Sequence, residues 1–581
     1  MRTARSAGPR RPALASLPLT MVAGVGLLMA LAVTSASAAP VAHAQSHTAT
    51  GYGVCPRTAQ LRSTGGALSA QFSQIIHVPA DQSTIQAAVN VAQAHALILV
   101  APGVYHEAVI VCTADLTIRG ADRNTTVLDG QSKLTNGFYA LADNVVIENM
   151  TAHHYVGNGF YWAYQTGYRG SYLTAYDNGD YGIYAFGSRH GEFDHSYASG
   201  SPDSGFYIGQ CFPCDAIINQ VRSEWNGLGY SGTNAGGNLL LENSEWDRNS
   251  AGIVPNTLDS EQGAPERGAT LLGNYVHDNG NDRAPYTVWA HIPLGVGILI
   301  AGGDKNYITR NRVVNNPTYG ILVLGNIDQN LWMASGNVVE RNSVSGSGLA
   351  DLALGAPSGA NNCFSDNQAT TTLPPLLEVT HACGSPLALD GGGDFGITLR
   401  MFANDVNAGL SAPGPSFNPP DYRTAPVPPP QTSMPDVSAA PAPTVLDTFP
   451  AGATSSNGYA PSANAYTPGG SAMFPPLGFT TYSVVQILLS LYGNLLLFAL
   501  YSAWLAIAFV ELAHRDDLRG GKRLGWGALT LGLPIVGPIL YYFASGSKLS
   551  PRFRLALVVG APALCLLVTV ILLVVASYTL L

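Results

Sequence analysis

The sequence predicts an all-β fold, a solenoid in which short parallel strands stack coil upon coil. A four-residue tag recurs about every 23 residues, as "NGFY", "NGFY", "YGIY", "SGFY", "LGYS", "AGIV", "VGIL" and "YGIL". Its glycines, separated by 22, 23, 23, 24, 23, 45 and 23 residues, are Gly137, Gly159, Gly182, Gly205, Gly229, Gly252, Gly297 and Gly320. Between the tags, β-rich runs such as "NVVIEN" and "NLLLEN" are bounded by turn residues. Strand repeats of this length indicate a parallel solenoid, and the signature of leucine-rich repeats is missing.

The segment that precedes the repeats resembles the opening of the pectin-lyase-like superfamily. This segment, residues 83–130, reads "STIQAAVNVAQAHALILVAPGVYHEAVIVCTADLTIRGADRNTTVLDG". The resemblance extends over about residues 79–385 and implies a right-handed parallel β-helix whose open end is capped by a helix. The residues agree with such a helix, because Ser83 and Gln86 form a capping box. Its apolar face is formed by Ile85, Ala88, Val89 and Ala92.

Side-chain alternation assigns a direction to each residue of the tag. The residues predicted to stack in the interior follow the tag glycines: Phe138, Phe160, Ile183, Phe206, Tyr230, Ile253, Ile298 and Ile321. The next residues must point outward, and the first four of them are Tyr139, Tyr161, Tyr184 and Tyr207. Because stacked strands lie about 4.8 Å apart, these form a ladder about 15 Å long that suits stacking against sugar rings. Ordinary sheet surface, where tyrosine is favoured, is the alternative.

Recurrent asparagines precede the tags and predict a ladder of turns. They are Asn178, Asn226, Asn249 and Asn316. Asparagine suits turns, and its amide can bond to the neighbouring coil. The turn "HDNG" at 277–280 follows the same pattern and is interpreted as structural.

The two ends predict export and membrane anchoring. Residues 1–40 read as a signal peptide, with an uncleaved anchor as the alternative, and 41–78 form an N-terminal segment. After the β-helix, 79–385, come a disordered Pro/Ala/Ser-rich linker, 386–481, and three transmembrane helices within 482–581. Positive charges in "HRDDLRGGKR" favour a cell-membrane location with the β-helix on the extracytoplasmic side.

The C-terminal stretch also resembles a known membrane module. Residues 503–546 are similar to the hydrophobic segment that precedes the nuclease domains of phospholipase D and cardiolipin synthase relatives. The matching features are Trp526, Pro534, Gly537, Tyr541 and Tyr542 after a charged loop. The catalytic H-x-K-x-x-x-x-D of those enzymes is missing from the chain, so the resemblance implies an anchor alone.

Charge narrows the range of partners. With the signal and residues 482–581 subtracted, the body holds 17 basic and 34 acidic residues, a net charge of −17. Nucleic acid is excluded as a partner because phosphate binding relies on clustered Lys and Arg. A polyanionic sugar is disfavoured unless a cation bridges the charges, so any cofactor stays open, with calcium as the candidate and no metal ligands assigned. The expected partners are carbohydrate and the lipid bilayer.

Six cysteines in an exported body predict disulfides. The expected pairs are Cys55 with Cys112, Cys211 with Cys214, and Cys363 with Cys383, among 15 formal pairings. The C-x-x-C at 211–214 could also serve redox chemistry or zinc. It lacks the βαβ setting of a redox motif and two further zinc ligands at suitable spacing, so a structural disulfide is favoured.

Candidate catalytic residues lie on and near two inserts, about 260–268 and 281–293, in the long 45-residue repeat, since long loops on a rigid scaffold tend to carry function. They are Asp203, Asp259, Glu261 and His291, with Trp289 as a substrate-binding residue beside them. Glycoside hydrolysis needs two carboxyl groups, and a lyase or epimerase needs a base. Solvated loop charge is the alternative. Neither the paired-aspartate and G-H-G pattern of polygalacturonases nor the D-P-H of mannuronan epimerases occurs.

These features predict an exported, membrane-anchored β-helix that acts on or binds carbohydrate at the cell surface, as a lyase, hydrolase or epimerase. One alternative is a non-catalytic glycan-binding or scaffold module. Another is a membrane-complex partner that acts through its helices. Convergence of the four candidate residues would favour catalysis, and scatter would favour binding.

Overall fold

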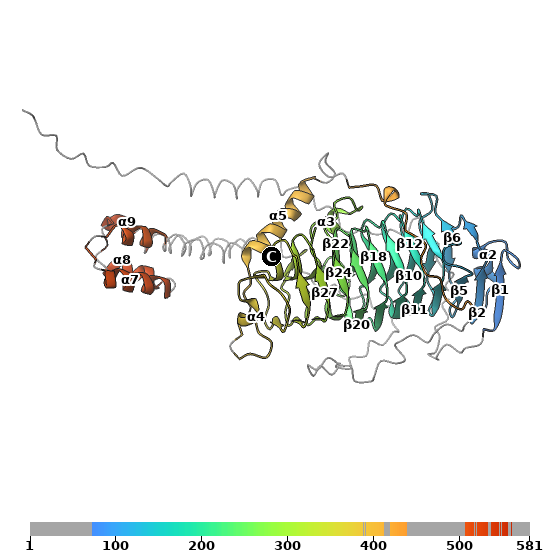
Figure 1. Ribbon diagram of the computed structural model, residues 1–581, viewed down its shortest axis with the longest axis horizontal. Helices are drawn as coiled ribbons and strands as arrows, with labels where there is room; N and C mark the ends of the chain where they lie inside the picture. Colours follow the sequence, from blue (N-terminus) through green and yellow to red (C-terminus); the bar gives the residue numbers. More distant parts are fainter. Residues whose placement is uncertain are drawn as a thin grey trace, which may run out of the picture. The chain divides into compact units, whose positions relative to one another are not determined.

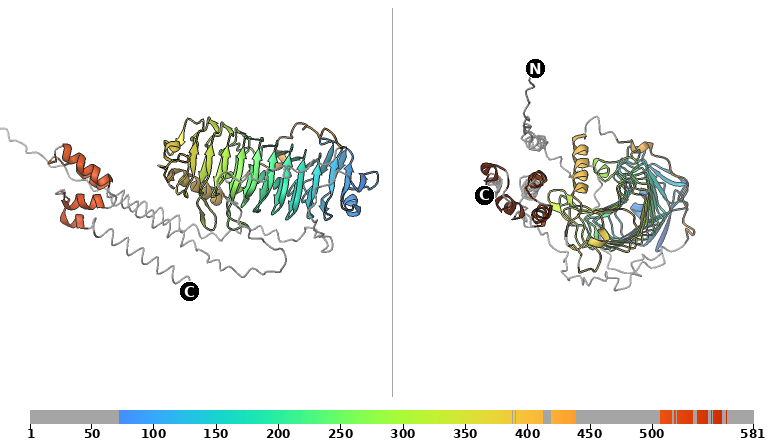
Figure 2. Two further views of the ribbon diagram at one scale, coloured as in Figure 1. Left: turned by 90° about the horizontal axis from the view of Figure 1, so that it is seen from below. Right: turned by 60° about the vertical axis from the view of Figure 1, so that its left-hand side comes forward.

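The computed structural model describes residues 72–386, 388–389, 391–411 and 419–438, and parts of 506–559. Residues 74–373 form a parallel β-helix in which three sheets run along a common axis (Figures 1 and 2). Every strand of a sheet pairs in parallel with its equivalents in the neighbouring coils. The parallel solenoid predicted from the tags is confirmed.

Sheet 1 has twelve strands: β1 (Gln74–Val78), β2 (Ala96–Val100), β5 (Thr117–Gly120), β8 (Val145–Glu148), β11 (Thr166–Ser171), β14 (Arg189–Asp194), β17 (Ala216–Asn219), β20 (Gly236–Glu242), β23 (Arg267–Leu272), β26 (Tyr307–Thr309), β31 (Val338–Glu340) and β34 (Cys363–Ser365). Sheet 2 carries the tags and has eleven: β4 (Val109–Val111), β7 (Phe138–Ala140), β10 (Phe160–Ala163), β13 (Tyr181–Phe186), β16 (Ser204–Gly209), β19 (Leu228–Thr233), β22 (Ala251–Asn256), β25 (Ile298–Ala301), β28 (Tyr319–Leu324), β33 (Ala350–Leu354) and β35 (Thr372–Leu373). Sheet 3 has ten: β3 (Gly103–Tyr105), β6 (Thr126–Asp129), β9 (Thr151–His153), β12 (Thr174–Tyr176), β15 (Tyr197–Ser199), β18 (Arg222–Glu224), β21 (Glu245–Asp247), β24 (Tyr275–His277), β27 (Arg312–Val314) and β32 (Ser343–Ser345). A small hairpin, β29 (Asn326–Ile327) with β30 (Leu331–Trp332), lies outside these sheets.

The core is a set of columns that run through the coils. The column predicted from the tags pairs in register, for example Phe138 with Phe160 and Ile183 with Phe206. All eight predicted members are fully buried. Each buried apolar side chain of this size contributes about 1.5–3 kcal/mol, so the column alone stabilises the solenoid substantially.

Asparagine ladders close the turns between coils. The backbone N–H and the side-chain amide of Asn226 donate to Oδ1 of Asn249, at 3.0 and 3.1 Å. Asn249 donates in the same way to Asn279, and Asn279 to Asn316. The predicted turn ladder is confirmed, and the "HDNG" turn belongs to it through Asn279. Further ladders join Asn274, Asn311, Asn342 and Asn367, and Asn306, Asn337 and Asn362.

The predicted N-terminal helix is α2 (Ile85–Val91). Ile85, Ala88 and Val89 are buried, as expected of its apolar face. The predicted capping box is wrong by one residue, because Thr84 is the N-cap and its side chain accepts from the N–H of Ala87. The free N–H groups of Ile85 and Gln86 donate to the carboxylate of Glu107 instead, which compensates the positive end of the helix.

Two of the predicted disulfides are confirmed. Cys211 pairs with Cys214, and Cys363 with Cys383. Cys112 is also disulfide-bonded, and its predicted partner Cys55 lies outside the described residues. The C-x-x-C pair is therefore part of a coil and is not available for redox chemistry or zinc in this state.

Part of the predicted linker is ordered against the β-helix, which corrects the expectation of disorder there. Two short helices, α3 (Val288–His291) and α4 (Leu377–Thr380), precede it, and α5 (Phe395–Ser411) contacts α3 (Figure 1). Residues 419–438, which include a 3-10 turn at Tyr422–Thr424, cross the coils as a strap. Strap residues bond to coil residues some 300 positions earlier, as Ser433 does to Asp122 (2.6 Å) and Met434 to Asn149 (2.8 Å).

Near the C-terminus the structure describes α7 (Gly520–Gly532), α8 (Val536–Ala544) and α9 (Pro551–Leu555). Trp526 and Tyr541 pack edge to face with ring centroids 5.9 Å apart. Among the described residues, no helix has both the length and the apolar character needed to cross a bilayer. The predicted signal peptide and most of the predicted membrane helices lie outside the described residues, so they stay predictions.

The asparagine ladder gives a stability prediction. Asn249→Ala leaves the buried N–H of Asn226 without an acceptor, and we expect the free energy of unfolding to fall by about 2–4 kcal/mol in urea denaturation. Asn90→Ala, at an exposed position of α2, is the control and should change it by less than about 0.5 kcal/mol. Equal effects of the two substitutions would contradict a structural role of the ladder.

Candidate functional site

The outer face of sheet 2 carries the predicted tyrosine ladder, and its rings do stack. Ring centroids are 4.7 Å apart for Tyr139 and Tyr161 and 4.5 Å apart for Tyr161 and Tyr184. Tyr207 meets Tyr184 edge to face at 4.8 Å. A further ring, Tyr181, stacks on Tyr184 at 4.2 Å. The spacing follows from the strand separation, because the four tyrosines occupy one register position.

The four tyrosines of the ladder differ in solvent exposure. Tyr184 and Tyr207 are only 8% and 3% exposed, whereas Tyr139 and Tyr161 are partly exposed. The expectation of four surface rungs is therefore corrected. Tyr139 and Tyr161 are exposed enough to contact a ligand, and Tyr184 and Tyr207 are the buried continuation of the same column.

Two aspartates stand at the edge of this column. Asp180 and Asp203 immediately precede β13 and β16, and Tyr181 pairs in register with Ser204, so the two aspartates lie one coil apart. The N–H of Asp203 donates to the carbonyl oxygen of Asp180 at 3.2 Å. Sequence reasoning found Asp203 and missed Asp180. The sequence does contain a signal for Asp180, since Asp180 and Asp203 each stand two positions before a tag glycine.

Their surroundings favour the protonated carboxyl. Burial raises the pKa of Asp180 to about 7. Burial and then the charge of Asp180 raise the pKa of Asp203 well above 3.8, although Tyr181 donates to it and opposes the shift. Burial and the repulsion between like charges on neighbouring coils therefore favour retention of a proton by this pair near neutral pH.

A third carboxyl comes from the first insert. Glu261 accepts from the side-chain amide of Gln210, and burial raises its pKa. It is near enough to raise the pKa of Asp203 and Tyr207 as well. The neighbouring Gln262 reaches Tyr164 at 3.4 Å, so this insert runs back over three coils along the end of the sheet 2 strands.

The second insert borders the opposite ends of these strands. The N–H of Thr287, the N-cap of α3, donates to the carbonyl of Pro202 at 2.8 Å, beside Asp203. Trp289 on α3 is 45% exposed. His291 stacks on Tyr286 with centroids 4.2 Å apart. Burial lowers the pKa of His291, and Asp282 opposes that shift.

Asp259 has a different environment from the other candidates. Its carboxylate accepts from the backbone N–H groups of Gln329 (2.8 Å) and Asn330 (3.3 Å) and from the side chain of Asn330. Burial opposes these bonds, and the net effect is a lowered pKa. Asp259 thus ties the first insert to the β29–β30 hairpin. Asp203 stands at the start of β16, whereas Glu261 contacts Gln210 beyond its end, and the two carboxyls interact electrostatically across the outer face of sheet 2. The structure adds Asp180 beside Asp203 and leaves Asp259 and His291 in other contacts.

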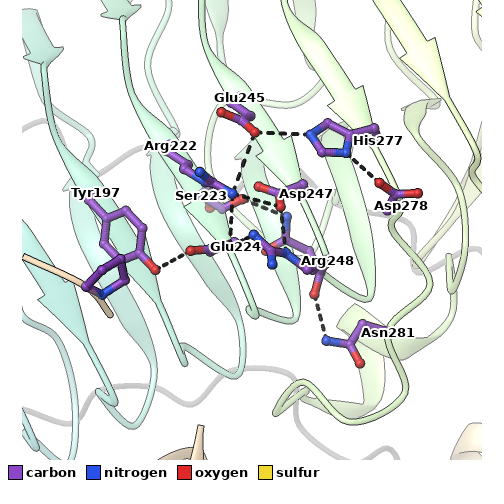
Figure 3. Close-up of polar contacts among 12 residues, drawn as sticks. Tyr197, Arg222, Ser223, Glu224, Glu245, Asp247, Arg248, His277, Asp278 and Asn281 are labelled. Carbon is purple, nitrogen blue, oxygen red and sulfur yellow. Dashed lines mark hydrogen bonds and ion pairs between the residues drawn. The ribbon is translucent and has the colours of Figure 1, made fainter. Parts of the chain in front are cut away.

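The outer face of sheet 3 carries a second polar cluster (Figure 3). Arg222 contacts Glu224 (3.2 Å), Asp247 (3.2 Å) and Glu245 (3.6 Å). Arg248 pairs with Asp247 at 2.7 Å and with Glu224. His277 meets Glu245 at 3.2 Å. In this cluster each carboxylate already has a cationic or histidine partner.

An open groove lies at the corner between sheets 1 and 3, apart from the tyrosine ladder. Its volume is about 560 Å³. Its lining includes Arg123, Tyr172, His195, Arg222, Tyr275 and Thr432 of the strap. Tyr172 and His195 stack with centroids 4.6 Å apart, which gives the groove an aromatic wall.

The outer face of sheet 2 combines partly exposed aromatic rings, a carboxyl pair with raised pKa values and a third carboxyl. Aromatic side chains suit the apolar surfaces of sugars, and a protonated carboxyl can act as a general acid. Asp180 and Asp203 directly precede strands, which position them rigidly.

Comparison with known proteins agrees with the fold. The family model described as a right-handed β-helix region matches residues 158–331. This match agrees with the parallel β-helix formed by residues 74–373 and supports the right-handed course that the resemblance implied. The comparison with curated proteins found no match.

Solved structures with a similar course include the A-module of the Azotobacter vinelandii mannuronan C-5 epimerase AlgE4. It is 17% identical, with a TM-score of 0.38 over 52% of this chain and 93% of that one. An alginate lyase from Paenibacillus sp. str. FPU-7 is 16% identical, with a TM-score of 0.34 over 51% and 99% of the two chains. Pectate lyase Pel9A is 15% identical, with a TM-score of 0.31 over 52% and 79%. Likeness at this level concerns the fold alone.

The retained proton gives a pH prediction. The folded chain holds protons on Asp180 and Asp203 that the unfolded chain releases near pH 4, so their contribution to stability falls as pH rises from about 4 through about 7. Asp203→Asn should flatten this decline and raise the free energy of unfolding at pH 8 by on the order of 1 kcal/mol. Denaturation at a series of pH values measures it. The exposed Asp366→Asn is the control, and identical pH slopes for Asp203→Asn and wild type would contradict the retained proton.

Proposed function

We propose that this chain binds carbohydrate on the outer face of sheet 2 and cleaves it there by acid-base chemistry. The observation that carries the proposal is the pair of carboxyls on neighbouring coils beside the stacked tyrosines. Tyr139 and Tyr161 stack on one another, so their partly exposed edges and hydroxyl groups would contact sugar, and Tyr184 and Tyr207 would keep the platform rigid.

Each carboxyl has a proposed role. The pair of Asp180 and Asp203 supplies the proton to the leaving oxygen of the glycosidic bond, because its raised pKa keeps a proton at neutral pH. Glu261, the third carboxyl, would act on the other side of the bond as base or nucleophile once ionised. Asp259 and His291 are left out of this set because other contacts engage them.

The charge of the site indicates which sugars fit. The body that carries Asp180, Asp203 and Glu261 has a net charge of −17. Uronic acid polymers would be repelled unless calcium bridged the charges, so we infer a neutral or cationic glycan as the substrate. Calcium is then dispensable for the reaction.

The location of this activity rests on the sequence. The predicted signal at 1–40 and the apolar segments in 482–581 support export, with the β-helix held on the extracytoplasmic face of the cell membrane. Under this proposal the Pro-rich linker gives the β-helix reach toward surface glycans.

A second candidate function is glycan binding without cleavage. The aromatic wall of Tyr172 and His195 in the open groove favours it, because the groove could hold a sugar chain away from the carboxyl pair. The third alternative, a membrane partner that acts through its helices, is supported only by the apolar C-terminal sequence.

A glycan panel tests the proposal. The purified full-length protein, in detergent, is incubated with neutral, cationic and acidic oligosaccharides, with calorimetry for binding and mass spectrometry for products. We expect products from a neutral or cationic glycan and a loss in kcat of about 100-fold or more for Asp203→Asn, since general acid catalysis contributes about 10²–10⁴. Tyr161→Ala should weaken binding by roughly 3- to 10-fold.

Asp366→Asn serves as the matched carboxyl control and should keep full activity. Binding without any product would rule out the enzyme and leave the binding module. Failure to interact with any glycan in the panel would contradict both.

A further inference from the structure

Sheet 3 brings together a set of histidines and aspartates near its N-terminal end. Asp129 ends β6 and pairs in register with His153, which ends β9. His154 and Asp177 follow β9 and β12 directly, and His106 follows β3. Because equivalent positions of neighbouring coils lie about 4.8 Å apart, five side chains with metal-binding atoms meet at one edge of the sheet.

Three of these side chains converge on one point. The Nδ1 atoms of His153 and His154 are 2.8 Å apart. Oδ1 of Asp129 lies 3.8 Å from the first and 3.7 Å from the second. All three donor atoms lie within 4.8 Å of one another. His106 contributes a further nitrogen, 3.6 Å from Oδ2 of Asp129.

The two carboxylates here lack a permanent positive partner. The ion pairs of Asp129 and Asp177 among the described residues are with histidines alone. The side chain of Asp177 is 1% exposed, and its Oδ1 has no hydrogen-bond partner in the described part of the chain. Oδ2 of Asp177 faces Nε2 of His154 at 3.7 Å. A buried carboxyl whose ion pair among the described residues is with His154 is placed to accept the Nε2–H of that histidine.

The second cluster of sheet 3 shows the contrast. Glu245, Asp247 and His277 also place donor atoms within 4.8 Å of one another. There, however, the guanidinium groups of Arg222 and Arg248 already contact the carboxylates (Figure 3). Two fixed positive charges would repel a metal ion, so this cluster is an ion-pair network.

We propose that Asp129, His153 and His154 bind a divalent transition-metal ion, of which Zn²⁺ fits the donors best. Imidazole and carboxylate are ligands that zinc accepts, at about 2.0–2.2 Å. The ligand atoms would be Nδ1 of both histidines and one oxygen of Asp129. In a tetrahedral site two nitrogens are about 3.3 Å apart, so binding needs the rings to separate by only about half an ångström.

Asp177 would act as a positioning residue. With Nδ1 of His154 on the metal, its Nε2–H points toward the Asp177 carboxylate, the carboxylate–histidine–zinc arrangement that orients a ligand and raises its basicity. His106 or water would complete the coordination.

Zinc titration of the full-length protein, purified without a histidine tag and stripped with a chelator, tests the site. Calorimetry should show saturable binding of one Zn²⁺ per chain to the wild type. His153→Phe removes the nitrogens but keeps a ring against Tyr176, whose centroid is 4.6 Å from that of His153. It should weaken binding by about 100-fold or more, because even outer partners of a metal site contribute about 10–100-fold.

His277→Phe is the matched control, since His277 stacks on Tyr275 in the same way at 3.9 Å and occupies the equivalent position of sheet 3. Its zinc binding should equal that of the wild type. Absence of saturable binding to the wild type, or loss of binding in both variants or in neither, overturns the assignment.

A second variant guards against misfolding. His154 has φ of +56°, a conformation that asparagine adopts readily, so His154→Asn keeps the backbone and removes a ligand. Circular dichroism confirms that each variant keeps its β-sheet signal. A folded His154→Asn protein that still binds Zn²⁺ as the wild type does would equally overturn the site.

Discussion

In-register stacking of the coils is the constraint on which the rest of the structure depends. Each residue lies over its equivalent in the previous coil. A residue type that recurs about every 23 positions therefore forms a column along the solenoid, with about 4.8 Å between successive members. Apolar columns form the core, and asparagine columns close the turns. The same stacking fixes the distance between equivalent side chains on the surface, so aromatic rings or charged groups in one column are neighbours at that spacing.

Like charges in one column repel one another, and the three polar surfaces, one on sheet 2 and two on sheet 3, differ in how this repulsion is reduced. On sheet 2, Asp180 and Asp203 are like charges one coil apart, and the conflict is relieved by keeping a proton. In the arginine-rich part of sheet 3, opposite charges from different coils neutralise one another, as Arg222 and Asp247 do. Near Asp129 and Asp177 the ion-pair partners of the carboxyls among the described residues are histidines.

Sequence reasoning reached the fold because the repeat is local and periodic. It placed the core column, the outward tyrosines, the asparagine ladder and two of the disulfides. It failed where contacts join distant parts of the chain. Asp259 is held by a hairpin 70 residues later, and the strap 419–438 was expected to be disordered although it bonds to coil residues such as Asp122. The burial of Tyr207 likewise depends on tertiary packing. Asp180 could have been predicted from the sequence, because the repeat register aligns it with Asp203.

The central claim is that the column of tyrosines and aspartates on sheet 2 is the surface that handles glycan. The most direct measurement is a crystal structure of the protein with a neutral or cationic oligosaccharide that it binds. The account predicts sugar rings in contact with Tyr139 and Tyr161, with a glycosidic oxygen within hydrogen-bond distance of the Asp180–Asp203 pair. A sugar chain in the groove beside Tyr172 and His195, with sheet 2 empty, would contradict it.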